Sequence, residues 1–349
     1  WLDRFLKHEP RELEEAAVKL FEPEQLNVFA ELPADERVTD VHEWFVSLAD
    51  TPSVPESTAE WSGLRDRLLS ALREQVLDEC PEHPAPCQKV SEHLWDGLRI
   101  TKYQLFCDGV YPLDLYTAGT IASDAEVQQV RLTAVDQAGY EQLTAMLAAG
   151  IPELRRGAVS EEAAADWQNL IQDVRESGRM NAWFVPRGIG PTEWSRNEKE
   201  RTHILRRFSL LGKTADELQT YDVVQAVRAI RGLPAATADL SQTPLTLAGE
   251  GVAAGWALYA AILEPNVQRL ELTSLPATHD LAPIYLNVRR HLDVPAALAL
   301  AAERMSMSLE LPADDVGIAD FAAAVAEKLG WGDEQVEVFT ETVENVVVE

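Results

Sequence analysis

The spacing of apolar and polar residues changes near residue 96 of the chain. Before that point, apolar residues recur every three or four positions, as they do along one face of an amphipathic helix. The clearest run predicts a helix over 57–79, beginning at a capping box formed by Ser57 and Glu60. Its apolar members are Trp61, Leu64, Leu68, Leu72 and Val76. Prolines flank this helix on both sides, and we predict that residues 1–95 form a helical and irregular extension or a linker from a preceding domain.

After residue 96, short alternating runs typical of strands take turns with helical runs. The first two, Leu98–Phe106 and Tyr111–Tyr116, flank a Cys-Asp-Gly turn and predict an antiparallel hairpin. Further strands are predicted at 127–135, 180–185, 244–248, 267–273, 305–310 and 335–340, and helices at 138–148, 160–176, 214–231, 252–263, 294–303 and 319–329. This alternation implies an α/β domain over 96–349, with a mostly parallel sheet of about eight strands and helices on both faces.

Composition narrows the class of protein. The chain has 349 residues, of which 46% are hydrophobic, so it can fill a sizeable core. It carries 30 basic and 58 acidic side chains, a net charge of −28, which argues against nucleic acid and anionic membrane as primary partners. No uncharged apolar run is long enough to predict a membrane span. We expect a very soluble protein, located outside the cell or in the periplasm.

The three cysteines leave the redox compartment open. Cys80 and Cys87 lie seven positions apart in a proline-rich segment, and Cys107 stands alone. A short disulfide between the first two would indicate an oxidising compartment, whereas two unpaired thiols would carry no such meaning.

The most informative segment is 245–258, where an apolar strand enters a glycine-rich turn and then a helix of small residues. This is the setting of a nucleophile elbow, G-x-S-x-G, in which a strained turn presents a serine. Here the pattern is Gly249-Glu250-Gly251-Val252-Ala253, so Gly251 stands where the serine would be. Read instead as a phosphate loop, the glycines are spaced one residue too widely for the dinucleotide fingerprint, and Glu250 would repel phosphate. We therefore expect no cofactor, and no cluster has metal-ligand spacing.

Two further segments join the elbow in one resemblance. Phe184–Pro191 is similar to an Arg-Gly-x-Gly turn that follows a central strand in certain esterases, and Leu211–Val227 is similar to the helix that precedes their elbow. Residues 96–349 thus resemble an α/β-hydrolase of the acetyl xylan esterase and dienelactone hydrolase-like branch. The resemblance implies carboxylic-ester hydrolase chemistry on a carbohydrate ester. Trp1–Lys7 also resembles the last helix of a preceding hydrolase domain, which would make an upstream domain of the same protein a partner.

The catalytic triad of this fold is incomplete in the sequence. The fold orders it as serine, then an acid after the seventh strand, then a histidine after the eighth. Asp314 and Asp315 stand where the acid is expected, but the last histidine is His291 and the nucleophile position is Gly251. We therefore predict a degenerate member, a pseudo-enzyme that serves as a structural or substrate-binding partner of an active hydrolase.

Two other functions remain open. An active carbohydrate or small-ester hydrolase would need a non-standard site. It would be built from Glu250 as a general base on water, from Ser274 and His279 in the loop after strand 267–273, and from Asp314. A carbohydrate-binding module would use aromatic faces, for which Trp194 and Trp256 flank the expected cleft. The stretch 181–232, with nine basic and six acidic residues, would form either an anion-binding rim or a set of local ion pairs.

Overall fold

The computed structural model describes residues 5–8, 21–29, 31–38, 41–45, 47–109, 111–121, 127–233, 240–332 and 334–341. Its contacts divide the chain into two units, Trp1–Ser47 and Leu48–Glu349. In the first unit the described residues include two single-turn helices, α2 (Pro23–Leu26) and α3 (Val41–Trp44), and the Arg37 guanidinium lies 4.0 Å from the centre of the Trp44 ring.

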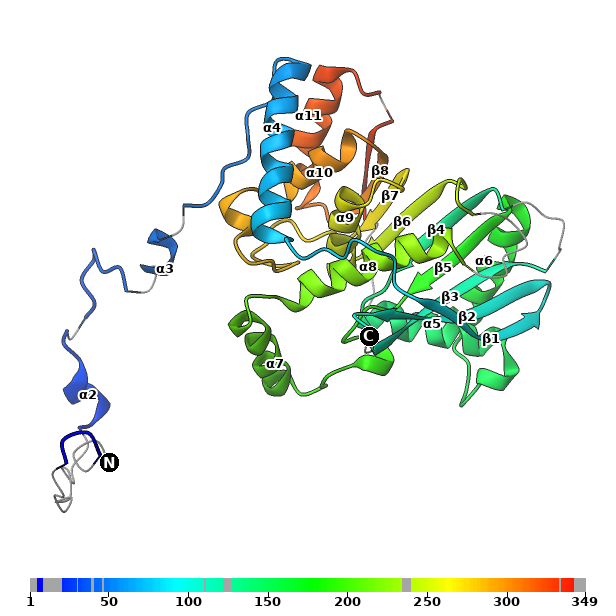
Figure 1. Ribbon diagram of the computed structural model, residues 1–349, viewed down its shortest axis with the longest axis horizontal. Coiled ribbons are helices and arrows are strands. Elements are labelled where there is room, and N and C mark those ends of the chain that lie inside the picture. The colour runs from blue at the N-terminus through cyan, green and yellow to red at the C-terminus, as the bar shows by residue number, and fades with distance from the viewer. Residues whose placement is uncertain are drawn as a thin grey trace, which may run out of the picture. The chain divides into compact units, whose positions relative to one another are not determined.

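The second unit is built on one nine-stranded sheet in the order β1-β2-β3-β5-β4-β6-β7-β8-β9 (Figure 1). The strands are β1 (Cys87–Trp95), β2 (Leu98–Cys107), β3 (Tyr111–Thr120), β4 (Gln129–Ala134), β5 (Arg179–Phe184), β6 (Leu245–Glu250), β7 (Arg269–Thr273), β8 (Ser306–Leu311) and β9 (Val336–Thr340). Strands β1, β2, β3 and β5 pair antiparallel, and all pairings from β5 through β4 to β9 are parallel. The predicted hairpin and parallel sheet are confirmed.

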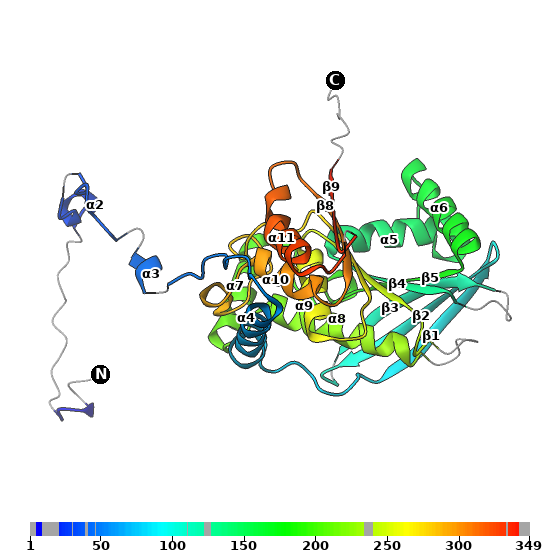
Figure 2. The same cartoon turned by 90° about the horizontal axis from the view of Figure 1, so that it is seen from above.

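Helices cover the sheet on both sides (Figure 2). They are α4 (Thr58–Ala71), α5 (Gln137–Gly150), α6 (Glu161–Ser177), α7 (Glu198–Leu210), α8 (Ala215–Arg231), α9 (Val252–Leu263), α10 (Val294–Ala302) and α11 (Asp320–Leu329). On one side Leu143 of α5 and Trp167 of α6 pack with Ile100 of β2. On the other, a larger core joins α4, α8, α9, α10 and α11 to the sheet. Burial on both faces is what a parallel sheet requires.

The segment before residue 96 enters the domain more deeply than its sequence suggests. Residues 87–95 form β1, an edge strand whose side chains are mostly exposed, so it shows no apolar alternation. The predicted helix forms as α4 and continues as a π-helical turn, Leu72–Val76, while buried Trp61 meets Trp331 edge to face at 5.3 Å. The division at 47/48 therefore differs from the boundary at residue 95 predicted from the sequence.

The cysteines resolve one alternative left open by the sequence. Cys80, Cys87 and Cys107 all carry free thiols. The structure forms no disulfide between Cys80 and Cys87, and Cys87 begins β1, where it pairs with Leu105. Burial raises the pKa of the Cys87 thiol to about 11, which keeps it protonated near neutral pH.

Candidate functional site

The glycine-rich turn has the strained backbone of a nucleophile elbow. Strand β6 ends at Glu250, Gly251 takes φ 56° and ψ −128°, and α9 begins at Val252. The turn is fixed by the Gly251 N–H, which donates to the Thr273 carbonyl at 3.0 Å, and by the Ala254 N–H, which donates to the Gly251 carbonyl at 3.1 Å. Only glycine adopts such angles without strain. Gly251 occupies the position at which an elbow of this kind presents its nucleophile, and it has no side chain.

Replacing Gly251 with alanine is expected to cost about 1–3 kcal/mol of unfolding free energy. The space itself is open, since an added Cβ would have Asp136 Oδ2, at 3.8 Å, as its nearest neighbour. The cost therefore comes from the backbone angles alone. Urea denaturation measures it, with Gly63→Ala on an open part of α4 as the control, which should be neutral or stabilising. Equal effects at the two positions would contradict the strain.

Carboxylates gather around this turn. Partial burial raises the pKa of Glu250, and the charges of Asp136, Glu341 and Glu310 raise it further. Asp136 caps α5 by accepting from the Gly139 N–H at 2.9 Å. A cavity of about 470 Å³ opens beside the turn and is lined by Glu250, Asp136 and residues of β4, β5, β6 and β7. Glu250, a predicted site residue and the chain neighbour of Gly251, thus lines a cavity.

Ser274 and His279 do not hydrogen-bond to each other. Ser274, with φ 49°, donates from Oγ to Glu341 Oε1 at 2.5 Å. Glu341 follows β9, where the fold would place its histidine. The His279 ring is buried between other partners, with Nδ1 at 2.6 Å from the Pro283 carbonyl and Nε2 at 2.6 Å from the Tyr259 hydroxyl. Because a carbonyl only accepts, Nδ1 carries the proton and Nε2 accepts from Tyr259.

His279 is expected to make stability depend on pH. Burial lowers its pKa, so the folded protein keeps the ring neutral while the unfolded chain takes up a proton below about pH 6.5. The unfolding free energy should therefore decrease as the pH is lowered through that range, by up to about 1.4 kcal/mol per pH unit from this one group. Urea titrations of His279→Gln should lack this part of the slope. The exposed control His203→Gln should keep it, and a slope unchanged in both variants would contradict the assignment.

Asp314 and Asp315 follow β8, as predicted for the acid of the triad. Asp314 is exposed and Asp315 half-buried at the start of a 3₁₀ turn, Val316–Ala319. Neither lines the cavity beside Glu250 or the larger one described next. Of these predicted site residues, Glu250 therefore lines a cavity, whereas both aspartates lie outside the two cavities.

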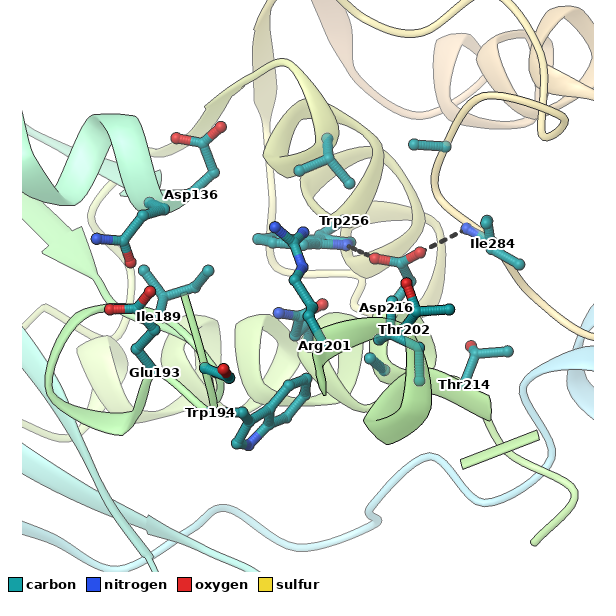
Figure 3. A pocket seen from close by; sticks show the side chains of 18 of the residues that line it. Asp136, Ile189, Glu193, Trp194, Arg201, Thr202, Thr214, Asp216, Trp256 and Ile284 are labelled. Atoms are coloured by element: carbon teal, nitrogen blue, oxygen red, sulfur yellow. Dashed lines mark hydrogen bonds between the residues drawn. The ribbon is translucent and has the colours of Figure 1, made fainter. Parts of the chain in front are cut away.

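A larger cavity of about 810 Å³ shares Asp136 with the first (Figure 3). Val252, Trp256, Trp194 and Arg201 also line it. Both tryptophans predicted to flank the cleft are therefore at this cavity. Trp256 is only 2% exposed, whereas Trp194 is half-buried, with its ring centre 5.2 Å from that of Phe208. Of the two tryptophans, Trp194 therefore has the ring that a ligand can contact.

Asp216 holds this cavity's wall together. Its carboxylate accepts from Trp256 Nε1 at 2.9 Å and from the Ile284 N–H at 2.7 Å, so it joins α8, α9 and the loop before α10 (Figure 3). Burial raises the pKa of Asp216. Sequence reasoning missed both Asp216 and Asp136. Asp136 had a signal, because it directly follows a strand that neighbours β6, but Asp216 is marked only as an acid in the first turn of a helix.

In the part of the chain that the structure describes, no group of three histidine, cysteine or carboxylate side chains is placed to hold a metal ion. Nor does any helix among those residues combine the length and apolar character needed to cross a bilayer.

Comparison with known proteins defines the fold. No family model and no curated protein matches the sequence. Among solved structures, a glucuronoyl esterase from Solibacter usitatus is similar over 86% of this chain and 94% of its own, with a TM-score of 0.59 and 14% identity. A promiscuous CE15 esterase from a marine bacterial metagenome is similar over 85% of this chain and 91% of its own, with a TM-score of 0.56 and 13% identity. A protein assigned as an acetyl xylan esterase from Bacteroides fragilis is similar over 81% of this chain and 74% of its own, with a TM-score of 0.57 and 14% identity.

The chain therefore has the α/β-hydrolase fold of these carbohydrate esterases, as the sequence resemblance predicted. At this level of identity the likeness concerns the fold alone.

Proposed function

We propose that this chain is an α/β-hydrolase-fold module that binds a carbohydrate ester without cleaving it by the serine route. The observation that carries the proposal is Gly251 at the elbow, with a backbone suited to a nucleophile and no side chain to attack a carbonyl. Glu341 after β9 adds to it, since a carboxylate bonded to Ser274 does not replace an imidazole base. Without nucleophile and base, only binding and backbone donors would remain to assist hydrolysis.

The larger cavity supports the binding half of the proposal. Its volume of about 810 Å³ lies within the range of small-molecule sites. Trp194 offers an aromatic face on which a sugar ring can stack, and polar side chains such as Gln219 and Thr202 offer hydrogen bonds.

Hydrolysis and binding should be measured on the same preparation. We expect no turnover of p-nitrophenyl acetate or acetylated xylan above the background of a heat-unfolded sample. We expect calorimetric heat with xylo-oligosaccharides that Trp194→Ala removes and Trp95→Ala, a change of an exposed tryptophan on β1, does not. Absence of heat at millimolar ligand would refute carbohydrate binding.

A second candidate is an active hydrolase that uses Glu250 as general base on water. The observation that favours it is the raised pKa of Glu250 beside a cavity, since a carboxylate that titrates closer to neutrality is a better base. Turnover that falls in Glu250→Gln, and not in the exposed control Glu327→Gln, would support this candidate and refute the pseudo-enzyme.

We further propose that the module acts outside the cytoplasm next to an upstream hydrolase domain of the same protein, for which the first unit would serve as linker. The likeness of Trp1–Lys7 to a final hydrolase helix supports the partner. The mass and sequence of the full-length product purified from its source test it. An intact G-x-S-x-G upstream would support the arrangement, and a product without such a domain would refute it.

A further inference from the structure

Helix α7 is packed unlike the other long helices of the domain. None of its thirteen side chains, from Glu198 to Leu210, is buried. The helix lies apart from the sheet and from the helices that cover it (Figure 1), and the Trp194–Phe208 ring contact at 5.2 Å joins it to the preceding loop. Leu210 and the following Leu211 are 85% and 80% exposed, among the most exposed apolar side chains of the second unit. Two adjacent leucines held in water need an explanation other than packing.

The charge of this helix is opposite to that of the chain. Residues 201–212 contain Arg201, Arg206 and Arg207 and no acidic residue, in a protein of net charge −28. Other basic side chains of the stretch 181–232 have acidic partners: Arg187 with Asp222, Arg196 with Glu193, Lys213 with Glu217 and Arg228 with Glu264. Four of the nine basic residues in the stretch thus form ion pairs, while Arg231 of α8 bonds to carbonyl oxygens and the three arginines of α7 take part in no ion pair among the described residues.

We propose that the end of α7, formed by Arg206, Arg207, Leu210 and Leu211 and called here the α7 tip, docks on an anionic lipid surface. Arg201, Thr202, Leu205, Arg206 and Ser209 of α7 line the larger cavity, so Arg206 lies where this cavity meets the tip, whereas Arg207, Leu210 and Leu211 do not line it. An exposed pair of leucines flanked by arginines matches a lipid interface, where apolar side chains enter the acyl boundary and cations meet the headgroups.

One observation favours a lipid surface over a folded acidic partner. The tip projects from the domain, and a projecting apolar pair enters a soft interface, whereas a folded partner would need a matching groove. The nearest acidic side chains, Asp78, Glu79 and Glu217, share Lys213 as a cationic partner two residues after Leu211. Acidic charges farther than about 8 Å from the tip are screened at physiological salt. The whole-chain charge thus argues against general attraction to anionic membranes, while the tip provides a local contact.

The test is co-sedimentation of the full chain with vesicles of phosphatidylcholine alone and of phosphatidylcholine with phosphatidylserine. We expect binding to the second only, weakened by added salt. Arg206→Gln with Arg207→Gln should lower the partition coefficient by about tenfold or more. Leu210→Ser with Leu211→Ser should lower it by a similar factor.

Matched controls are Arg67→Gln with Arg73→Gln, exposed arginines of the α4 region, and Leu94→Ser on β1, and these should bind as the unchanged chain does. No binding to the anionic vesicles, or a loss shared equally by the controls, would overturn the proposal. It would also be overturned if the tip variants abolished self-association in sedimentation velocity while vesicle binding was absent, because the tip would then be a contact between copies.

Discussion

Replacing Asp222 with alanine is expected to lower the free energy of unfolding by about 3–5 kcal/mol, the largest effect of any single change considered for this protein. Asp222 is fully buried in α8 and accepts three bonds from Arg187, from the backbone N–H at 3.1 Å, from Nε at 2.8 Å and from a terminal nitrogen at 2.6 Å. Burial lowers the pKa of Arg187, but the bonds and charge of Asp222 outweigh it and hold the guanidinium charged. Without Asp222, the largely buried guanidinium of Arg187, whose side chain is 18% exposed, would lose its main partner.

Urea denaturation of the two proteins measures this cost. The matched control is Asp108→Ala, because Asp108 also bonds Arg187, at 2.7 Å, but is about half exposed. Removal of that exposed partner should cost about 1 kcal/mol or less. A loss at Asp222 no larger than the loss at Asp108 would contradict the assignment of Arg187 and Asp222 as a buried pair. Arg187 lies in the loop that follows β5 and carries Trp194, so loss of its bond to Asp222 in α8 should also loosen that loop.

The second large effect is expected at Gly249. A Cβ built there would lie 2.5 Å from the Ala253 carbonyl oxygen and 2.8 Å from the Ala254 nitrogen. Both are backbone atoms of α9, which no change of rotamer relieves, so the helix would have to move away from β6. We expect Gly249→Ala to cost about 3 kcal/mol of unfolding free energy, at the upper end for overpacking.

Thermal or urea unfolding of Gly249→Ala should be compared with Gly119→Ala. Gly119 also lies in a strand, β3, but an added Cβ would have its nearest neighbour, Met180 Cγ, at an ordinary 3.8 Å. The control should change stability by about 1 kcal/mol or less. Similar losses at the two glycines would mean that the close approach of β6 and α9 is not what requires glycine.

The sequence predicted the parts of the fold in which local pattern and burial agree. The apolar strand, glycine turn and small-residue helix at 245–258 became β6, Gly251 and α9, because only small residues allow the backbone approach seen at Gly249. Strand β1 escaped prediction because an edge strand with exposed side chains has no apolar period. Helix α7 escaped it for a similar reason, since no face of it is buried.

The candidate site was harder to predict than the fold, because side-chain partners come from distant segments. His279 and Ser274 are five residues apart, yet the ring bonds to Tyr259 of α9 and the hydroxyl bonds to Glu341 after β9. Spacing along the chain says nothing about such long-range partners. Asp216 shows the same limit, because its role depends on Trp256 and Ile284, which lie 40 and 68 positions away.

The backbone at Gly251 also bears on how this protein could change. The turn already has the dihedral angles that a serine at an elbow must adopt. Its neighbourhood is open enough for a Cβ. The scaffold therefore combines a strained turn with an adjacent cavity, and the residue in that turn has no side chain. Directed evolution toward an esterase would begin here with side chains, at residue 251 and after β9, and would leave the main chain as it is.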